Sequence, residues 1–198
     1  MTLLNSILEH IQISFLGVLM ALVTGVVLAA LMNRQKLLKQ VVFIVIDVIQ
    51  TVPTLAMFTF VMLVFGLNNT TVIVSVFLYS LFPIIRNTYT GIASVSPSVI
   101  RAARGIGMTD FQIYTKIELP IALPVIITGV KLALVSALSI TTTGVLIGAG
   151  GLGMLVWRGI QTRNTTMMLS GAVPVSVLAI LTDWVLSRVE KWLVTYRS

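Results

Sequence analysis

IQISFLGVLMALVTGVVLAALM, at residues 11–32, is a run of 22 residues without a charged side chain. A helix rises 1.5 Å per residue, so about 20 apolar residues cross a hydrocarbon core of about 30 Å. This run therefore predicts a membrane-spanning helix. The rest of the 198-residue chain agrees, because 57% of it is hydrophobic and only 10% is charged, whereas soluble domains carry roughly a quarter charged residues. The sequence is that of an integral membrane protein.

Four more apolar runs of similar length follow the first. They cover residues 41–65, 71–89, 124–147 and 167–186. The run at 71–89 is the weakest, since Pro83 and Arg86 interrupt its end. We expect an all-α integral membrane protein with about five transmembrane helices, in which residues 1–198 form a single transmembrane domain.

The residue types that support hydrolytic or redox chemistry are scarce. The chain has no cysteine and one histidine, His10, so thiol chemistry and H-E-x-x-H-type zinc sites are excluded. A serine–histidine pair is not expected either, because His10 precedes the first apolar run. We expect no catalytic residue, no metal site and no cofactor on this chain, and we expect His10 on the surface of the outer leaflet. Residues 1–12 lack the basic region of a secretory signal, so the first run is expected to be retained.

Basic residues predict the orientation. Ten fall on one side of a five-span topology and two, Arg158 and Arg163, on the other. Cytoplasmic loops carry the excess of lysine and arginine, so the N-terminus is expected outside and the C-terminus in the cytoplasm. The net charge of +7 is then explained without a nucleic-acid partner. The ten residues are Arg34, Lys36, Lys39, Arg86, Arg101, Arg104, Lys116, Arg188, Lys191 and Arg197.

A polar insert at residues 94–120 falls on the predicted cytoplasmic side. Ser96 followed by Pro97 predicts the start of a helix, and the glycines up to Gly107 predict a turn after it.

Thr109 can cap a second helix over residues 111–118, and Leu119-Pro120 predicts its end, because the residue before a proline is pushed out of the helical region. The shape expected is helix, glycine turn, helix. An ordinary amphipathic interfacial loop has a similar composition, so the residue pattern alone leaves both interpretations open.

The insert resembles the EAA loop of ABC-importer permeases. That motif runs E-A-A, three residues, G, nine residues, I, one residue, L-P. The matching positions are Arg101, Ala102, Ala103, Gly107, Ile117, Leu119 and Pro120. Arg101 departs from the pattern, because the family usually has glutamate there. The resemblance implies that these residues couple the chain to an ATPase.

Two further segments resemble one branch of these permeases, the quaternary-amine and osmoprotectant importers. QTVPTLAMFTF at residues 50–60 is similar to their second-span signature, and IGAGGLGMLVWRGIQT at residues 147–162 is similar to their outer segment. Read instead as a dinucleotide-binding motif, GAGGLG fails, because it follows a membrane helix and no βαβ unit is present.

The resemblance implies a type I ABC importer permease in a bacterial plasma membrane. Its partners would be two copies of a cytoplasmic ATPase that binds ATP and Mg²⁺, a second permease chain (the same or a paralogue), an extracytoplasmic binding protein and membrane lipid. The solute expected is a small quaternary ammonium compound such as glycine betaine, carnitine or choline. An importer of an amino acid or another small polar solute, similar to the methionine importers, is the alternative. The remote alternative is a stand-alone channel or an intramembrane enzyme.

Polar residues inside spans are the candidates for the translocation pathway, because they cost free energy in hydrocarbon. Helix packing and bonding of hydroxyls to the preceding turn are the competing explanations. The candidates are Gln50, Thr51, Pro53, Thr54, Ser139, Thr142 and Gly144.

Charged residues and glycines in the spans raise three further expectations. Asp47 should pair with a lysine of the preceding loop. Lys131 should extend to the inner interface or pair with Asp47 or Asp183. Residues 144–153 are possible gate backbone, and a short outer helix or re-entrant segment should follow them.

Overall fold

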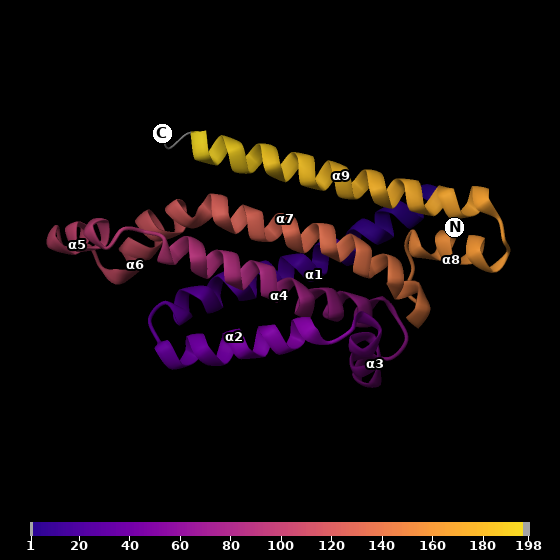
Figure 1. Cartoon of the computed structure of the whole chain (residues 1–198), viewed down its shortest axis with the longest axis horizontal. Helices are drawn as coiled ribbons and strands as arrows, with labels where there is room; N and C mark the ends of the chain where they lie inside the picture. Colours follow the sequence, from indigo (N-terminus) through magenta and orange to yellow (C-terminus); the bar gives the residue numbers. More distant parts are fainter. Residues whose placement is uncertain (1, 196–198) are drawn as a thin grey trace.

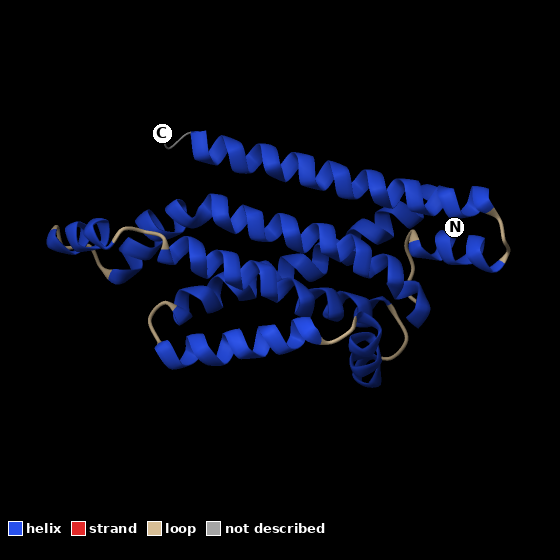
Figure 2. Cartoon of the chain, in the orientation of Figure 1, coloured by secondary structure: helices blue, strands red, loops and turns tan. Residues whose placement is uncertain are grey.

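The computed structural model describes residues 2–195, and every regular element in that range is a helix (Figure 2). In chain order the α-helices are α1 Leu3–Met32, α2 Lys36–Thr51, α3 Thr54–Phe65, α4 Asn69–Ala93, α5 Pro97–Gly105, α6 Asp110–Ile113, α7 Leu119–Thr143, α8 Gly153–Gln161 and α9 Thr165–Thr195. A π-helical turn, η1 (Tyr114–Glu118), precedes α7, and a 3₁₀ turn, η2 (Gly144–Ile147), follows it.

Helices α1, α4 and α7 form the centre of the bundle, with α2 and α3 on one side and α9 on the other (Figure 1). Small residues allow the central helices to approach closely. A Cβ on Gly17 of α1 would lie 2.6 Å from a methyl of Val76, and a Cβ on Gly129 of α7 would lie 2.8 Å from the carbonyl of Pro83. Such contacts supply much of the packing between helices in a membrane.

The expected continuous span at residues 41–65 is wrong, because α2 and α3 meet at an angle of 106°. Val52, which precedes Pro53, is extended (φ −67°, ψ 126°) and ends α2, as the ring of a following proline favours. The hydroxyl of Tyr79 donates to the Val52 carbonyl that this break exposes. Within residues 2–195, four helices are long and apolar enough to cross a membrane, and the bent α2–α3 pair would make a fifth span.

The long helices place the connecting segments at two ends (Figure 1). The α1–α2 loop, α5, α6 and the end of α9 lie at one end, which we call the coupling end after the coupling residues expected there. The start of α1, the α3–α4 loop and α8 lie at the other, which we call the outer end after the expected orientation. Most of the ten grouped basic residues belong to the coupling end. Arg86 does not, because α4 continues past it to Ala93, and Arg197 lies outside the described residues.

The insert between α4 and α7 folds as a helix, a turn and a second helix. Ser96 caps α5, and Gly107 adopts a positive φ of 85° as expected. Thr109 caps α6 in a reciprocal arrangement with Gln112.

The expected helix end at Leu119-Pro120 is wrong. In the π-helical turn η1 the N–H of Leu119 bonds to the carbonyl of Tyr114, five residues back. Pro120, which has no N–H, therefore sits in the first turn of α7, where a missing donor is tolerated. The helix runs on to Thr143.

Candidate functional site

A cavity of about 460 Å³ lies between the α2–α3 break, α4 and α7. The break contributes Gln50, Thr51, Pro53 and Thr54, four of the seven predicted pathway residues. Pro53 produces the bend, so the same residue that interrupts the span also creates space beside it. The side chains of Gln50 and Thr51 are exposed, so the cavity opens onto the surface of this chain.

Helices α4 and α7 supply lining residues that the sequence analysis did not select: Tyr79, Ser80, Phe82 and Ser136. Tyr79 and Phe82 bring aromatic rings to the cavity. Helical spacing was the available signal for α7, because residues three or four apart share a face. It could not say which face of α7 meets the α2–α3 break.

The other three predicted pathway residues lie elsewhere. Ser139 is exposed and does not line the cavity. The hydroxyl of Thr142 donates to the carbonyl of Leu138 at 2.9 Å, which is a hydrogen bond to the preceding turn of its own helix. Gly144 is buried, and a Cβ there would lie 2.7 Å from Val72 of α4. The structure therefore does not bring these residues together with the group around Pro53.

None of the cavity's lining residues is charged. The ion pair nearest to it in sequence joins Asp47 of α2 to Arg86 of α4, whose Nη2 donates to both carboxylate oxygens at 2.7 and 2.8 Å. The expected pairing of Asp47 with a loop lysine is therefore wrong. Phe43 and Phe82 flank the guanidinium, with ring centroids 5.3 and 5.1 Å from its carbon, and hold it against α2.

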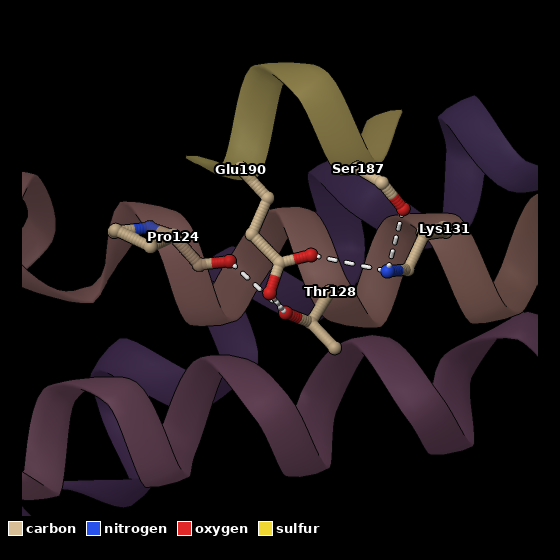
Figure 3. A network of polar contacts seen from close by, with 5 residues as sticks. All are labelled: Pro124, Thr128, Lys131, Ser187 and Glu190. Atoms are coloured by element: carbon tan, nitrogen blue, oxygen red, sulfur yellow. Dashed lines mark hydrogen bonds and ion pairs between the residues drawn. The ribbon is translucent and has the colours of Figure 1, made fainter. Parts of the chain in front are cut away.

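Lys131 of α7 also has an unexpected partner (Figure 3). Its Nζ lies 3.1 Å from Oε2 of Glu190 and 3.1 Å from the hydroxyl of Ser187, both on α9. The other carboxylate oxygen of Glu190 accepts from Thr128 at 2.9 Å. Pairing of Lys131 with Asp47 or Asp183 is therefore wrong. The sequence missed Glu190 because α9 extends well beyond the apolar run that predicted it.

His10 is fully buried, so its expected place on the surface is wrong. Its Nε2 donates to the carbonyl of Leu138 of α7 at 3.1 Å. The helix α1 begins at Leu3, earlier than the apolar run at residues 11–32, and this places His10 inside the bundle. The short helix expected after residues 144–153 is confirmed as α8.

The predicted coupling residues have different surroundings. Arg101, Ala102 and Gly107 are exposed, whereas Ala103 is only 4% exposed and packs inside this chain. Ile117 and Leu119 are half-buried and Pro120 is exposed at the junction with α7. Ala103 is therefore not available to a partner in this conformation.

Two large apolar side chains that the motif does not include are highly exposed in the insert. Ile106 is 81% exposed and Phe111 is 72% exposed, on either side of the Gly107 turn. Their apolar character in a polar segment was a signal that the sequence analysis did not use. Together with Gly107 they form what we call the apolar tip of the coupling end.

Comparison with solved structures identifies the fold. A chain of the MetNI methionine ABC transporter, in an inward-facing conformation, matches with a TM-score of 0.82 at 22% identity, over 93% of each chain. A chain of an amino acid ABC transporter with histidines matches with a TM-score of 0.72 at 20% identity, over 96% of this chain and 91% of the other. The fold is that of a type I ABC importer permease.

Curated relatives are considerably closer in sequence. The glycine betaine/carnitine/choline transport system permease protein OpuCD of Bacillus subtilis (strain 168) is 46% identical over 189 residues, which are 95% of this chain and 82% of the relative. The choline transport system permease protein OpuBD of the same organism is also 46% identical, over 92% of this chain and 81% of the relative. The family model for the binding-protein-dependent transport system inner membrane component matches residues 16–195. This chain therefore belongs to that family, and it is a multi-pass membrane permease of a transport system.

Proposed function

We propose that this chain is the permease subunit of an ATP-driven importer of small quaternary ammonium solutes such as glycine betaine, carnitine or choline. The uncharged cavity beside the α2–α3 break carries the proposal. The relatives named for transport of these solutes support it.

The chemistry of the cavity suits such a solute. A quaternary ammonium group cannot donate hydrogen bonds and is attracted to the faces of aromatic rings. Tyr79 and Phe82 provide rings, while Gln50, Thr54 and Ser136 provide neutral polar groups. No fixed cation among the lining residues repels the solute, and no fixed anion holds it too tightly for release.

The exposed rim of the cavity supports a second permease chain as a partner. A pathway for a polar solute must exclude lipid, and this chain leaves Gln50, Thr51 and Ser136 exposed. A second copy of the chain, or a paralogue, would close the open side. An extracytoplasmic binding protein would deliver the solute, as the family description implies.

The apolar tip supports docking of a cytoplasmic ATPase, with ATP and Mg²⁺ bound there and none on this chain. Exposed Ile106 and Phe111 are suited to burial in a groove of a partner, and α5 and α6 hold them on a short, capped frame. This assignment places the coupling end in the cytoplasm and the N-terminus outside. Single cysteines should then react with an impermeant reagent in intact cells at Thr70 and resist it at Gln35.

The test compares two serines of α7. Ser136 lines the cavity and Ser139 does not, although both are exposed on the same helix. Ser136→Leu should remove most uptake of radiolabelled glycine betaine or choline in cells that lack other importers, whereas Ser139→Leu should retain it. Equal effects of the two changes would contradict the proposed pathway. Uptake of methionine in place of the quaternary amines would contradict the proposed solute.

A further inference from the structure

Three segments that are distant in sequence meet at Glu9, at the outer end of the bundle. Oε1 of Glu9 accepts a hydrogen bond from the side-chain amide of Asn69, at the start of α4, at 2.8 Å. Oε2 accepts the backbone N–H of Gly151 at 2.9 Å. The amide oxygen of Asn69 in turn accepts the N–H of Gly150 at 2.9 Å. Three hydrogen bonds therefore join α1, α4 and the glycine segment between η2 and α8.

The glycines are required where this cluster forms. A Cβ on Gly150 would lie 2.2 Å from the carboxylate of Glu9, and a Cβ on Gly151 would lie 3.1 Å from Nδ1 of His10. Gly151 also has a φ of +86°. Successive backbone N–H groups in such turns form a concavity that binds anions. GAGGLG is thus an anion-binding turn whose anion is a carboxylate of the same chain.

Buried polar contacts at the next residue of α1, and about one turn beyond it, fix the position of α1 against α7. His10 donates to the carbonyl of Leu138, and the hydroxyls of Ser14 and Thr141 lie 2.8 Å apart with both side chains buried. The Glu9 cluster continues this polar seam to its outer end. There Glu9 and Asn69 are only half-buried, so water can replace their hydrogen bonds at a small net cost.

We propose that Glu9 and Asn69 are positioning residues of a latch that holds the outer end of α7 against α1 and α4, and that opening of this latch is a step in solute uptake. The glycine segment follows η2 directly, and η2 follows α7, which carries Ser136 of the cavity. Holding Gly150 and Gly151 therefore holds the outer end of a helix that lines the cavity. The role in uptake rests on the proposed import function, whereas the latch itself does not.

The hydrogen-bond pattern allows a swap of the two side-chain types. With Glu9→Gln alone, an amide NH₂ must face either the Asn69 NH₂ or a glycine N–H, whichever way the amides turn. With Asn69→Asp alone, two carboxylates face each other. With both changes, the glutamine oxygen accepts from Gly151, its NH₂ donates to the new carboxylate, and that carboxylate accepts from Gly150. All three bonds are restored with the charge moved to α4.

Leu152 provides a probe of the latch that is independent of transport. It is fully buried next to Gly151, and the chain has no cysteine. In a Leu152→Cys background, the rate of labelling by a maleimide in the detergent-solubilised complex reports how often the segment opens. We expect each single change to raise that rate by about tenfold, the loss of one hydrogen bond to a charged group, and the double change to return it to within about twofold of the parent.

Uptake is measured in the same variants without the cysteine, at several solute concentrations and normalised to chain in the membrane. We expect each single change to alter the maximal rate more than the KM, and the double change to restore it. Labelling that is unaltered by the single changes, or not restored by the double change, would overturn the latch. Uptake at the parental rate in both single variants would overturn its role in import. Restored labelling in a complex that imports no quaternary amine would instead contradict the proposed function and leave the latch standing.

Discussion

The two ends of this molecule use the same kind of residue in opposite settings. Gly107 at the coupling end and Gly151 at the outer end have nearly the same backbone angle, with φ of +85° and +86°. A Cβ added at Gly107 would meet no atom within 4 Å, whereas a Cβ at Gly151 would press against His10. One glycine shapes an open turn, and the other admits a neighbouring helix.

This difference extends to the side chains around each turn. At the outer end, Glu9 and Asn69 satisfy the backbone of the glycine segment, so the chain is bound to itself. At the coupling end, Ile106 and Phe111 extend away from the chain with most of their surface exposed. Large exposed apolar groups at the water-facing end of a membrane protein mark a surface for a partner. The comparison therefore separates an end that is bound to itself from the end at which we propose that a partner docks.

The largest effect is expected from Ala103→Glu. Ala103 is buried within the coupling end itself, and an unpaired buried carboxylate costs several kcal/mol. The amount of folded chain should fall, together with the midpoint of thermal unfolding in detergent. Ala102→Glu is the matched control. Because Ala102 is exposed, this substitution should leave the unfolding midpoint nearly unchanged. Equal loss of folded chain in both variants would contradict the distinction between a buried Ala103 and an exposed Ala102.

A smaller effect is expected from Gly150→Ala at the outer end. The added methyl must displace the Glu9 carboxylate, which would lie 2.2 Å from it, and overpacking of this kind costs about 1–3 kcal/mol. Gly105→Ala is the control at the coupling end, since its Cβ meets nothing within 4 Å and alanine is the better helix former by about 1 kcal/mol. The unfolding midpoint should fall for Gly150→Ala and stay level or rise for Gly105→Ala. A lower unfolding midpoint for Gly105→Ala than for Gly150→Ala would contradict the difference between the two ends.

The smallest effect is expected from Arg101→Glu, which restores the residue that the family usually has at this position. Arg101 is exposed on α5, and surface substitutions usually change the free energy of unfolding by less than about 0.5 kcal/mol. Stability and uptake should both remain near the parental values. A large loss of uptake with normal stability would show that a partner at the coupling end is adapted to the arginine.

Local chemistry explains which features could be predicted from the sequence. Ser96 and Thr109 cap helices, and Gly107 takes a positive φ, because caps and turns depend on a few neighbouring residues. The length of each apolar run predicted the long helices, because it is also read from one continuous stretch of sequence. Pro53 was recognised within its span, but the 106° bend that it accompanies was not.

The errors about individual charged and polar side chains concern contacts between helices. The partners of Asp47, Lys131 and His10 are Arg86, Glu190 and the Leu138 carbonyl. Each depends on how far one helix is shifted along another, and a single sequence carries no record of that shift. The same limit explains why Ser139 was selected for the pathway, although it is Ser136 that lines the cavity. The two serines lie about one turn apart on one face of α7, so helix periodicity cannot tell which of them is level with the α2–α3 break.

Recovery of the ATPase on the affinity-purified permease tests most directly the claim that the coupling end is completed by a partner. The variant is Ile106→Asp with Phe111→Asp, and the control is Leu67→Asp, an apolar position in the α3–α4 loop at the outer end that is also mostly exposed (67%). We predict that the tip variant loses the ATPase while keeping a parental unfolding midpoint, and that the Leu67 variant retains it. Full recovery of the ATPase on the tip variant would contradict the account.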